Sequence, residues 1–551
     1  MSDAGLSEVS DANKTALDYY DVAIVGYGPG GEVLASTLGA AGVRVLVVER
    51  WPQPYPLPRL TTLCGECCRI IQATGANIDQ AFSHTRSQAS CNFVDEAGAP
   101  ILIVPYPGDI GGWPSRVSMF QPDIERAIAD KVEQMDNVDV LRGWEATELW
   151  QDSDCVHLII VPFARNDDRN QARQRTIKAK YLVGADGARS LVRQLTAIPV
   201  KDFGLHERWL NYDAENKKPL DDRFLELNIY MDPARPHMYM PIGKRGLRME
   251  FRVMDDETDE EVTQPGVAED FMRRKYGIDP ADMRIMRRVV YHYRTRLAEK
   301  WRMDRIFLIG DAAHTMPPYM GQGAAAAIRD GLNLGWKLIE VLAGRSSDAL
   351  LNEYQRERQP HLQTIQDAAT VLSDMVNVTD RVRAEHRNQG MRQQGVAKPP
   401  ELPSLTTGVL HRRSDGSVVA PAGEFAPQGR LRRGGATMRG DDLLGYGFQL
   451  WLRRDAGANL GGPERAWLGT LGCLIASFEG NDDDAVEDVD RSYRDYLDRY
   501  DVDAVIVRPD FHVFGGAKFP DLNALIRDLA GQLHSTKRPE PEQNALRVGA
   551  P

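Results

Sequence analysis

The chain has 551 residues, too many for one hydrophobic core, so two or three domains are expected. Hydrophobic residues make up 42% and charged residues 26%, proportions typical of a soluble globular protein. The formal net charge of −12 argues against nucleic acid or an acidic membrane surface as the main partner. No apolar run is long enough to span a membrane and no signal peptide precedes Tyr20, so we expect a cytoplasmic protein.

A glycine-rich turn lies between the first two predicted strands. Residues 22–25 predict a buried strand, and four glycines fill the turn that follows: Gly26, Gly28, Gly30 and Gly31. Gly26 permits the tight turn, Gly28 lets the backbone approach a pyrophosphate, and Gly31 lets the next helix pack close to the sheet. Glu49 ends the second apolar run, where a carboxylate can accept a hydrogen bond from a ribose hydroxyl. This order predicts an ADP-binding site.

Periodicity predicts the other elements along the chain. A helical period covers residues 123–135. The predicted strands are 138–142, 147–151, 156–162, 180–185, 224–231, 237–240, 247–254 and 305–310. Long helices are expected over 321–343 and 346–376, with a polar continuation to about residue 390. The alternating strands after residue 200 indicate an antiparallel domain inserted into the first domain.

Two glycine-flanked aspartates follow predicted strands. Asp186 lies in the segment 181–190, and Asp311 opens the segment that ends in Gly321-Gln322-Gly323. Asp311 can accept a hydrogen bond from a ribityl or ribose hydroxyl. The glycines at 321–323 open a helix whose unpaired N–H groups and dipole would stabilise negative charge on a reduced flavin. Together with the first turn, these motifs predict a flavin dinucleotide.

The chain contains six cysteines: Cys64, Cys67, Cys68, Cys91, Cys155 and Cys473. The Cys64-Gly-Glu-Cys67 sequence is similar to a redox or zinc half-site. A structural zinc site needs four ligands, and no second paired cluster exists in the sequence. We therefore expect free thiols that are buried or partly buried, and no metal site.

These motifs resemble those of the single-component FAD-dependent aromatic hydroxylases, which include para-hydroxybenzoate hydroxylase and phenol hydroxylase. The resemblance runs from about residue 20 to about residue 515 and is closest to the branch of hydroxyphenylpropionate and polyketide aromatic hydroxylases. It implies an α/β fold: a para-hydroxybenzoate-hydroxylase-like FAD domain, an inserted antiparallel-sheet substrate domain and a C-terminal thioredoxin-like domain. Where the branch usually has Asp-Asp-Glu, this chain has Cys64-Gly65-Glu66, which puts the usual contacts there in doubt.

The implied domains have boundaries that composition helps to place. The last unit lacks the paired cysteines of disulfide exchange, so we expect a structural unit and possibly a homodimer surface. The predicted division is a disordered lead-in (1–17), the first part of the FAD domain (18–199), the substrate domain (200–290), the second part of the FAD domain with helices (291–390), a linker (391–404) and the thioredoxin-like domain (405–540).

The resemblance also implies roles for individual residues. The ADP half of non-covalent FAD is expected at the first turn and at Glu49, with Arg50 and Arg59 near the adenosine and pyrophosphate. Gln121 is expected near the flavin side of the phosphates. Asp311 would bind the ribityl chain, and Asp186 belongs to a motif linked to FAD and nicotinamide nucleotides. The isoalloxazine ring is expected against Pro318, Gly321, Gln322 and Gly323.

The reaction implied is monooxygenation. NADH or NADPH reduces the flavin, O₂ forms a flavin C4a-hydroperoxide, and an electron-rich aromatic ring takes the distal oxygen. A base near the ring hydroxyl is expected, because phenols react better as phenolates. His237 and Tyr239 share one face of a predicted strand and are candidates, as is His292. Tyr212 and Arg248 are further candidates.

Other outcomes stay open on the same fold. The enzyme could perform a Baeyer–Villiger oxygenation, or a hydroxylation that expels nitrite or halide. A flavin-binding protein without oxygenase activity is the remaining alternative. Substrate-dependent oxidation of NAD(P)H and analysis of the product would separate these readings.

Overall fold

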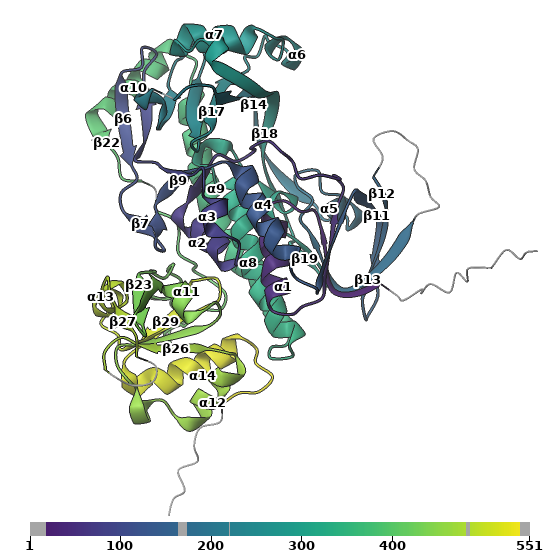
Figure 1. Cartoon of the computed structure of the whole chain (residues 1–551), viewed down its shortest axis with the longest axis vertical. Helices are drawn as coiled ribbons and strands as arrows, with labels where there is room; N and C mark the ends of the chain where they lie inside the picture. Colours follow the sequence, from purple (N-terminus) through teal and green to yellow (C-terminus); the bar gives the residue numbers. More distant parts are fainter. Residues whose placement is uncertain (1–17, 164–173, 220, 400, 481–484, 540–551) are drawn as a thin grey trace, which may run out of the picture.

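The computed structural model describes residues 18–163, 174–219, 221–399, 401–480 and 485–539. Figure 1 shows two sheets packed around long central helices, with a separate C-terminal unit below them. The predicted lead-in of residues 1–17 lies outside the described residues. None of the helices in the described ranges combines the length and apolar character that crossing a bilayer requires.

The first sheet is built on buried parallel strands. Its order is β10 (Val138–Arg142), β2 (Val45–Glu49), β1 (Asp18–Val25), β13 (Arg175–Gly184), β12 (Val156–Pro162) and β11 (Trp144–Gln151). A short strand, β20 (Ile306–Leu308), pairs with β13 and with β19 (Arg302–Met303). Val22, Ala23 and Ile24 have no exposed surface, as expected of a parallel strand covered on both faces. The predicted strands 138–142 and 156–162 are confirmed at both ends.

Helices cover this sheet. They are α1 (Pro29–Ala40), α4 (Gln121–Val132), α5 (Leu191–Leu195), α8 (Gly323–Leu342) and α9 (Glu353–Val376), with α2 (Gly65–Ala73) and α3 (Ile78–Ala81) beside them. Glycines let α1 and α8 cross closely: a Cβ on Gly331 would lie only 2.5 Å from the carbonyl oxygen of Gly30. The predicted helices 321–343 and 346–376 correspond to α8 and α9, and a 3-10 turn over Asp348–Asn352 precedes α9.

The second sheet extends beyond the predicted interval 200–290. Its order is β21 (His314–Thr315), β18 (Met283–Ala298), β14 (Val200–Asn216), β17 (Gly246–Arg252), β16 (His237–Ile242), β15 (Leu227–Tyr230), β5 (Ser90–Val94), β6 (Pro100–Pro105) and β22 (Gly395–Val396). Strands β5 and β6 come from the first part of the chain, and β22 comes from the predicted linker. Chain-order reasoning misses such pairings because they join segments that are far apart in the sequence.

The second sheet has one face under helices and one face toward the first domain. Helices α6 (Asp259–Val262) and α7 (Val267–Tyr276) pack an apolar cluster against the outer face. The inner face meets the short 3-10 turn Pro318–Met320, whose Tyr319 ring lies 5.9 Å from that of Trp209 on β14. The predicted polar helix near residue 390 is a separate helix, α10 (Arg381–Gln394).

Small strands and turns join the two sheets to the C-terminal unit. Strand β3 (Thr62–Cys64) pairs with β9 (Arg116–Ser118), which also pairs with β4 (Arg86–Ser87). A two-stranded ribbon consists of β7 (Asp109–Ile110) and β8 (Trp113–Pro114). Strand β3 runs directly into α2, so it fixes the start of that helix.

The C-terminal unit has a mixed four-stranded sheet among its described residues. In chain order it runs β25 (Gln449–Leu452), α12 (Gly462–Thr470), β26 (Leu474–Ser477), α13 (Ser492–Arg499), β28 (Ala504–Val507), β29 (Val513–Ala517) and α14 (Leu522–Gln532). The spatial order β26-β25-β28-β29, with β25 and β26 parallel, is consistent with the predicted thioredoxin-like arrangement. A second small sheet contains β23 (Arg430–Arg433), β24 (Ala436–Arg439) and β27 (Glu487–Asp488), and α11 (Gly440–Leu444) follows β24.

Candidate active site

A cleft of about 840 Å³ runs along the carboxyl ends of β1, β2 and β13. This is the edge at which parallel α/β sheets bind nucleotides. The cleft brings together predicted cofactor residues from distant parts of the chain: Gly26, Gly28, Glu49, Arg50, Arg59 and Asp186. Its position and lining residues fit the ADP half of a dinucleotide.

The glycines of the first turn have different spatial constraints. Gly26 has φ +102°, and a Cβ there would lie 2.4 Å from the carbonyl oxygen of Ala185. A Cβ on Gly31 would lie 2.4 Å from the carbonyl oxygen of Gly26. A Cβ on Gly28 would meet no heavy atom within 4 Å. Gly26 and Gly31 therefore serve close packing, whereas Gly28 leaves open space where a pyrophosphate can approach the start of α1.

Backbone N–H groups hold the Glu49 carboxylate at the cleft wall. Its Oε2 accepts a hydrogen bond from the N–H of Tyr27 at 2.9 Å, and its Oε1 accepts one from Trp51 at 2.8 Å. Each carboxylate oxygen has a second lone pair available. A fixed acid at this place fits a ribose hydroxyl donor.

Asp186 and Gln121 have bonds within the protein that explain part of their position. Asp186 Oδ2 accepts hydrogen bonds from the N–H groups of Leu191 and Val192 at the start of α5, while its buried Oδ1 has no partner among the described residues. Gln121 Oε1 accepts from the N–H groups of Arg59 at 2.8 Å and Leu60 at 2.6 Å. Gln121 thus holds the segment that carries Arg59 beside the cleft.

The two predicted arginines are exposed at the cleft. The guanidinium of Arg50 lies 5.4 Å from the centre of the Trp51 ring, and that of Arg59 lies 4.6 Å from the centre of the Tyr55 ring. Neither side chain has a hydrogen bond to another described residue, so both can reach a phosphate or an adenine ring.

The loop after β20 presents Asp311. Its side chain is exposed and has no hydrogen bond within the described part of the chain. A hydrogen bond holds the neighbouring backbone in place, because Gly310 donates its N–H to Asp330 Oδ2 at 3.0 Å. His314 Nε2 lies 2.7 Å from the same oxygen. A carboxylate that is free on a rigid loop fits the predicted ribityl contact.

The turn before α8 supplies the predicted flavin contacts. Pro318 lies in the 3-10 turn, and Gly321 takes the left-handed conformation with φ +60°. The side chain of Gln322 does not cap α8; its Oε1 accepts a hydrogen bond from Arg329 Nη1 at 2.9 Å. A Cβ on Gly323 would meet nothing within 4 Å. The start of α8 therefore offers open space and uncapped N–H groups to an anionic ring.

The structure corrects the prediction for His237 and Tyr239. Both face outward, against α7: His237 Nδ1 lies 2.7 Å from the Tyr276 hydroxyl, and the Tyr239 hydroxyl donates to the carbonyl oxygen of Arg223. The two side chains do share one face of β16, as predicted, but helices α6 and α7 cover this face of the sheet. Alternation then places Met238 and Met240 on the inner face instead.

His292 is also corrected. Its side chain is about half exposed, and Nε2 lies 2.7 Å from Asp259 Oδ2 at the start of α6. The outer face of β18 therefore carries His292, whereas the turn Pro318–Met320 meets the inner face of the sheet. Tyr212, a further candidate, lies in the same outer cluster.

Arg248, the remaining candidate, lies on the inner face in a buried ionic network. Its Nε is 2.7 Å from Asp213 Oδ1, and Arg287 Nη2 is 2.6 Å from Asp213 Oδ2. Both arginines also donate to the carbonyl oxygen of Pro58, at 2.7 Å and 2.8 Å. The network fastens the segment between β2 and β3 to the sheet.

Glu250 lies next to this network with its side chain 5% exposed. Asn211 Nδ2 donates to its Oε1 at 2.9 Å. Burial raises the pKa of Glu250 to about 7, against the opposing effect of Arg248. Sequence analysis missed Asp213, Glu250 and Arg287, although charged residues at alternate positions of apolar strands were a usable signal.

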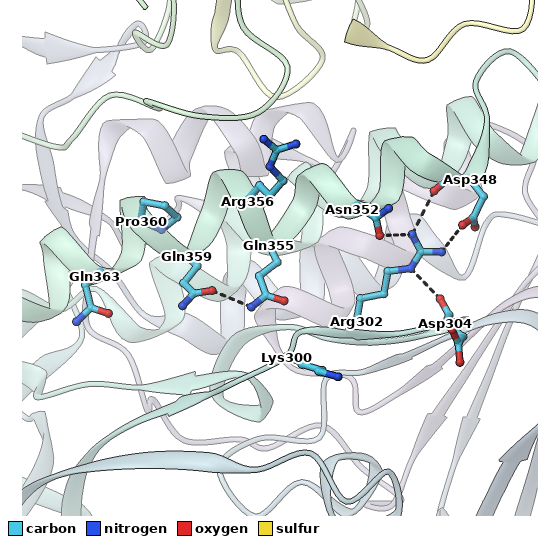
Figure 2. A pocket seen from close by; sticks show the side chains of 10 residues that line it. All are labelled: Lys300, Arg302, Asp304, Asp348, Asn352, Gln355, Arg356, Gln359, Pro360 and Gln363. Atoms are coloured by element: carbon cyan, nitrogen blue, oxygen red, sulfur yellow. Dashed lines mark hydrogen bonds and ion pairs between the residues drawn. The ribbon is translucent and has the colours of Figure 1, made fainter. Parts of the chain in front are cut away.

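A second hollow, of about 900 Å³, lies outside this site. Figure 2 shows it beside α9, where Arg302 bonds to Asp348 and Asn352, and Gln355 bonds to Gln359. None of the predicted cofactor residues lines it. The nucleotide cleft is therefore the better site candidate.

Comparison with known proteins agrees with the geometry. Residues 19–369 match the family described as FAD binding domain, and residues 423–532 match the HcaD C-terminal domain. A probable NADH-specific resorcinol 4-hydroxylase of Rhodococcus jostii (strain RHA1) is 31% identical, over 95% of this chain and 96% of its own. A 3-(3-hydroxy-phenyl)propionate/3-hydroxycinnamic acid hydroxylase of Paraburkholderia xenovorans (strain LB400) is 30% identical, over 96% and 93% of the two chains.

Solved structures share the fold. The flavin-dependent monooxygenase PieE, in complex with FAD and substrate, superposes with a TM-score of 0.78 at 22% identity, over 94% of this chain and 100% of its own. Aklavinone-11 hydroxylase with FAD and aklavinone gives a TM-score of 0.70 at 22% identity, over 93% and 99% of the two chains.

The first prediction separates the two glycine roles. Gly28→Ala should leave the free energy of unfolding within about 1 kcal/mol of wild type and weaken FAD binding at least about tenfold, because only the ligand meets the new methyl group. Gly26→Ala should destabilise the apoprotein by about 1–3 kcal/mol, because its methyl group meets the backbone of Ala185. Urea unfolding and FAD titration check both; unchanged FAD affinity in Gly28→Ala would contradict the placement.

The second prediction concerns Asp311. Asp311→Asn should raise the Kd for FAD about 10- to 100-fold, the loss expected for a hydrogen bond to a charged acceptor. Asp304→Asn is a matched control, because Asp304 is exposed in a nearby turn at φ +53°, which asparagine tolerates. Equal FAD affinity in the two variants would rule out the ribityl contact.

Proposed function

This chain belongs to the FAD-dependent aromatic hydroxylases, and we propose that its substrate is a small single-ring phenol and its preferred electron donor is NADH. The enzyme hydroxylates an aromatic ring with O₂ and a reduced nicotinamide. Relatives that act on resorcinol or on hydroxyphenylpropionate, matched over nearly their whole length, support a single-ring substrate. The printed name of the first relative supports NADH.

The observation that carries the proposal is the inner face of the second sheet. It lies against both segments that border the predicted flavin position. Thr61 Oγ1, just before β3, contacts the Met240 sulfur at 3.0 Å, and Trp209 packs edge-on against Tyr319 in the turn before α8. Bound FAD supplies the activation of O₂, and the residues on this face would hold the ring and exclude water.

The charges on this face favour a phenolate. Arg248 and Arg287 share one fully buried carboxylate, Asp213, while burial raises the pKa of Glu250 to about 7. When Glu250 is protonated, two guanidinium groups face one carboxylate, so the network carries a net positive charge. A positive network with little exposed surface stabilises an anionic oxygen nearby more than water does.

Glu250 is the best-placed group to take the phenol proton. Its carboxylate is nearly buried, and the raised pKa matches a base that works near neutral pH. Loss of the proton from the ring hydroxyl to Glu250 leaves the phenolate beside the arginines. Asn211, which donates to Oε1, would orient the carboxylate. These roles are proposed from position and charge.

The proposal is tested by a panel of phenols. NADH consumption should rise with single-ring phenols such as resorcinol and 3-(3-hydroxyphenyl)propionate, with label from ¹⁸O₂ in one new hydroxyl group of the product. NADPH, tested in parallel, should give a lower kcat/KM. Release of nitrite or halide from substituted phenols, or insertion of oxygen into a carbon–carbon bond, would show a different outcome on the same fold. If no phenol in the panel raises the rate of NADH oxidation above the rate measured without a phenol, the proposed substrate class is wrong.

The pH dependence tests the proposed base. A base must be deprotonated to act, so kcat should rise with pH through about 7, the pKa of Glu250. Glu250→Gln should lose this limb and lower kcat by about 10²-fold or more.

The matched control is Glu215→Gln. Glu215 lies on the same side of β14 but at the sheet end, where it pairs with Arg245 and Arg284. That variant should keep the wild-type pH profile. A Glu250→Gln enzyme that retains the limb near pH 7 would exclude this residue as the base.

A further inference from the structure

Two cysteine thiols face each other at the start of α2. Cys64 Sγ lies 3.6 Å from Cys67 Sγ. Cys64 is the N-cap residue, with extended backbone at φ −86° and ψ 159°, and Cys67 lies in the first helical turn. An S–S bond is about 2.05 Å long, so a rotation about the side-chain bonds would close the gap. This Cys-x-x-Cys geometry at a helix N-terminus is typical of thiol redox sites.

The two thiols differ in their surroundings. Arg329 Nη2 lies 3.4 Å from Cys64 Sγ, and the same guanidinium pairs with Glu66 at 2.7 Å. The hydrogen bond from Cys67, opposed by burial and aided by Arg329, lowers the pKa of Cys64 to about 6. The hydrogen bond to Cys64 and burial raise the pKa of Cys67 well above its usual value. One thiolate beside one thiol is the arrangement of an attacking and a resolving cysteine.

This pair lies next to the flavin turn. Arg329, which contacts Cys64, also donates to the side chain of Gln322 in that turn. Cys67 Sγ lies 3.9 Å from the carbonyl oxygen of Ala325 in the first turn of α8. Strand β3 carries Thr62 two residues before Cys64, and a Cβ on Gly321 would lie 2.9 Å from the Thr62 hydroxyl. The dithiol is therefore separated from the predicted ring position by about one layer of residues.

We propose that Cys64 and Cys67 are a redox-active dithiol that hydrogen peroxide from the flavin site oxidises to a disulfide, and that reduced flavin restores. All six cysteines are free in the structure, and both members of this pair are buried, so the oxidant must be a small molecule such as hydrogen peroxide. Bound FAD would supply this oxidant, because reduced flavin that reacts with O₂ without hydroxylating a substrate yields hydrogen peroxide. The inference rests on FAD binding, not on the identity of the aromatic substrate.

Both steps balance. The Cys64 thiolate attacks one oxygen of hydrogen peroxide, the O–O bond breaks, and hydroxide leaves to give a sulfenic acid. The Cys67 thiol attacks this sulfur, the S–S bond forms, and a second hydroxide leaves. One hydroxide takes up the thiol proton and becomes water, and the other is released to the solvent. In reverse, the disulfide would accept two electrons and one proton from anionic reduced flavin bound at the turn before α8. The S–S bond breaks into the Cys64 thiolate and the Cys67 thiol, and oxidised flavin remains.

Mass spectrometry of the holoenzyme tests the first step. After treatment with one equivalent of hydrogen peroxide and alkylation of free thiols, the peptide with Cys64 and Cys67 should be two hydrogens lighter and unalkylated at both residues. Cys68, which is buried one residue further along α2, should stay alkylatable after denaturation. Alkylation of both Cys64 and Cys67, or overoxidation of Cys64 without a disulfide, would overturn the proposal.

Anaerobic reduction tests the second step without any aromatic substrate. The peroxide-treated enzyme should take up four electrons per FAD from NADH, or from NADPH if that coenzyme reduces the flavin. Cys64→Ser, which lacks the attacking thiolate, should take up two, and Cys68→Ser, the matched control on the same helix, should take up four. Uptake of two electrons by wild type, with the disulfide intact afterwards, would refute the exchange with flavin. Hydroxylation assays on the same samples report separately on the proposed function.

Discussion

One buried carboxylate fixes the flavin side of the site. Asp330 on α8 accepts the N–H of Gly310, contacts the ring of His314, and pairs with Arg358 Nε of α9 at 2.9 Å. Burial raises its pKa, but the charges of His314 and Arg358 lower it to about 2. The carboxylate therefore stays charged at any pH at which the enzyme would work. The loop that presents Asp311 and the helix that begins at the flavin turn are thereby held to each other.

Helices α8 and α9 also contact the C-terminal unit. Glu357 on α9 pairs with Lys337 of α8 and with Arg508 of the C-terminal unit, and all three side chains are fully buried. Asp510 completes the network by pairing with Arg508 at 2.6 Å. Breaking one partner of such a network leaves an uncompensated charge and costs about 3–5 kcal/mol. The C-terminal unit thus braces α8 from the end opposite the flavin turn, which fits the predicted structural role.

The sequence predicted those features that depend on local geometry. The turn at Gly26 and Gly28 and the acid at Glu49 lie within one β-α-β unit, where spacing alone determines position. The sequence did not predict which face of the second sheet points toward the flavin, because that depends on tertiary packing. Alternation put His237 and Tyr239 on one face but did not show that α6 and α7 cover that face. The homodimer and the cytoplasmic location stay predictions, because a single chain carries no observation of either.

The predicted FAD contacts and the proposed substrate contacts differ in how freely their residues can be substituted. The predicted FAD contacts include Gly26 and Gly321, whose positive φ values of +102° and +60° exclude most side chains, so these two positions tolerate little variation. The residues proposed to hold the aromatic ring are distributed over separate strands of the second sheet, and each is a side chain on a regular β scaffold. One substitution there alters charge or volume without moving the backbone. The Asp213 network is the exception, because it also ties the Pro58 segment to the sheet. Substrate preference can therefore shift at Met240 more readily than at Arg248, Arg287 or the proposed base Glu250.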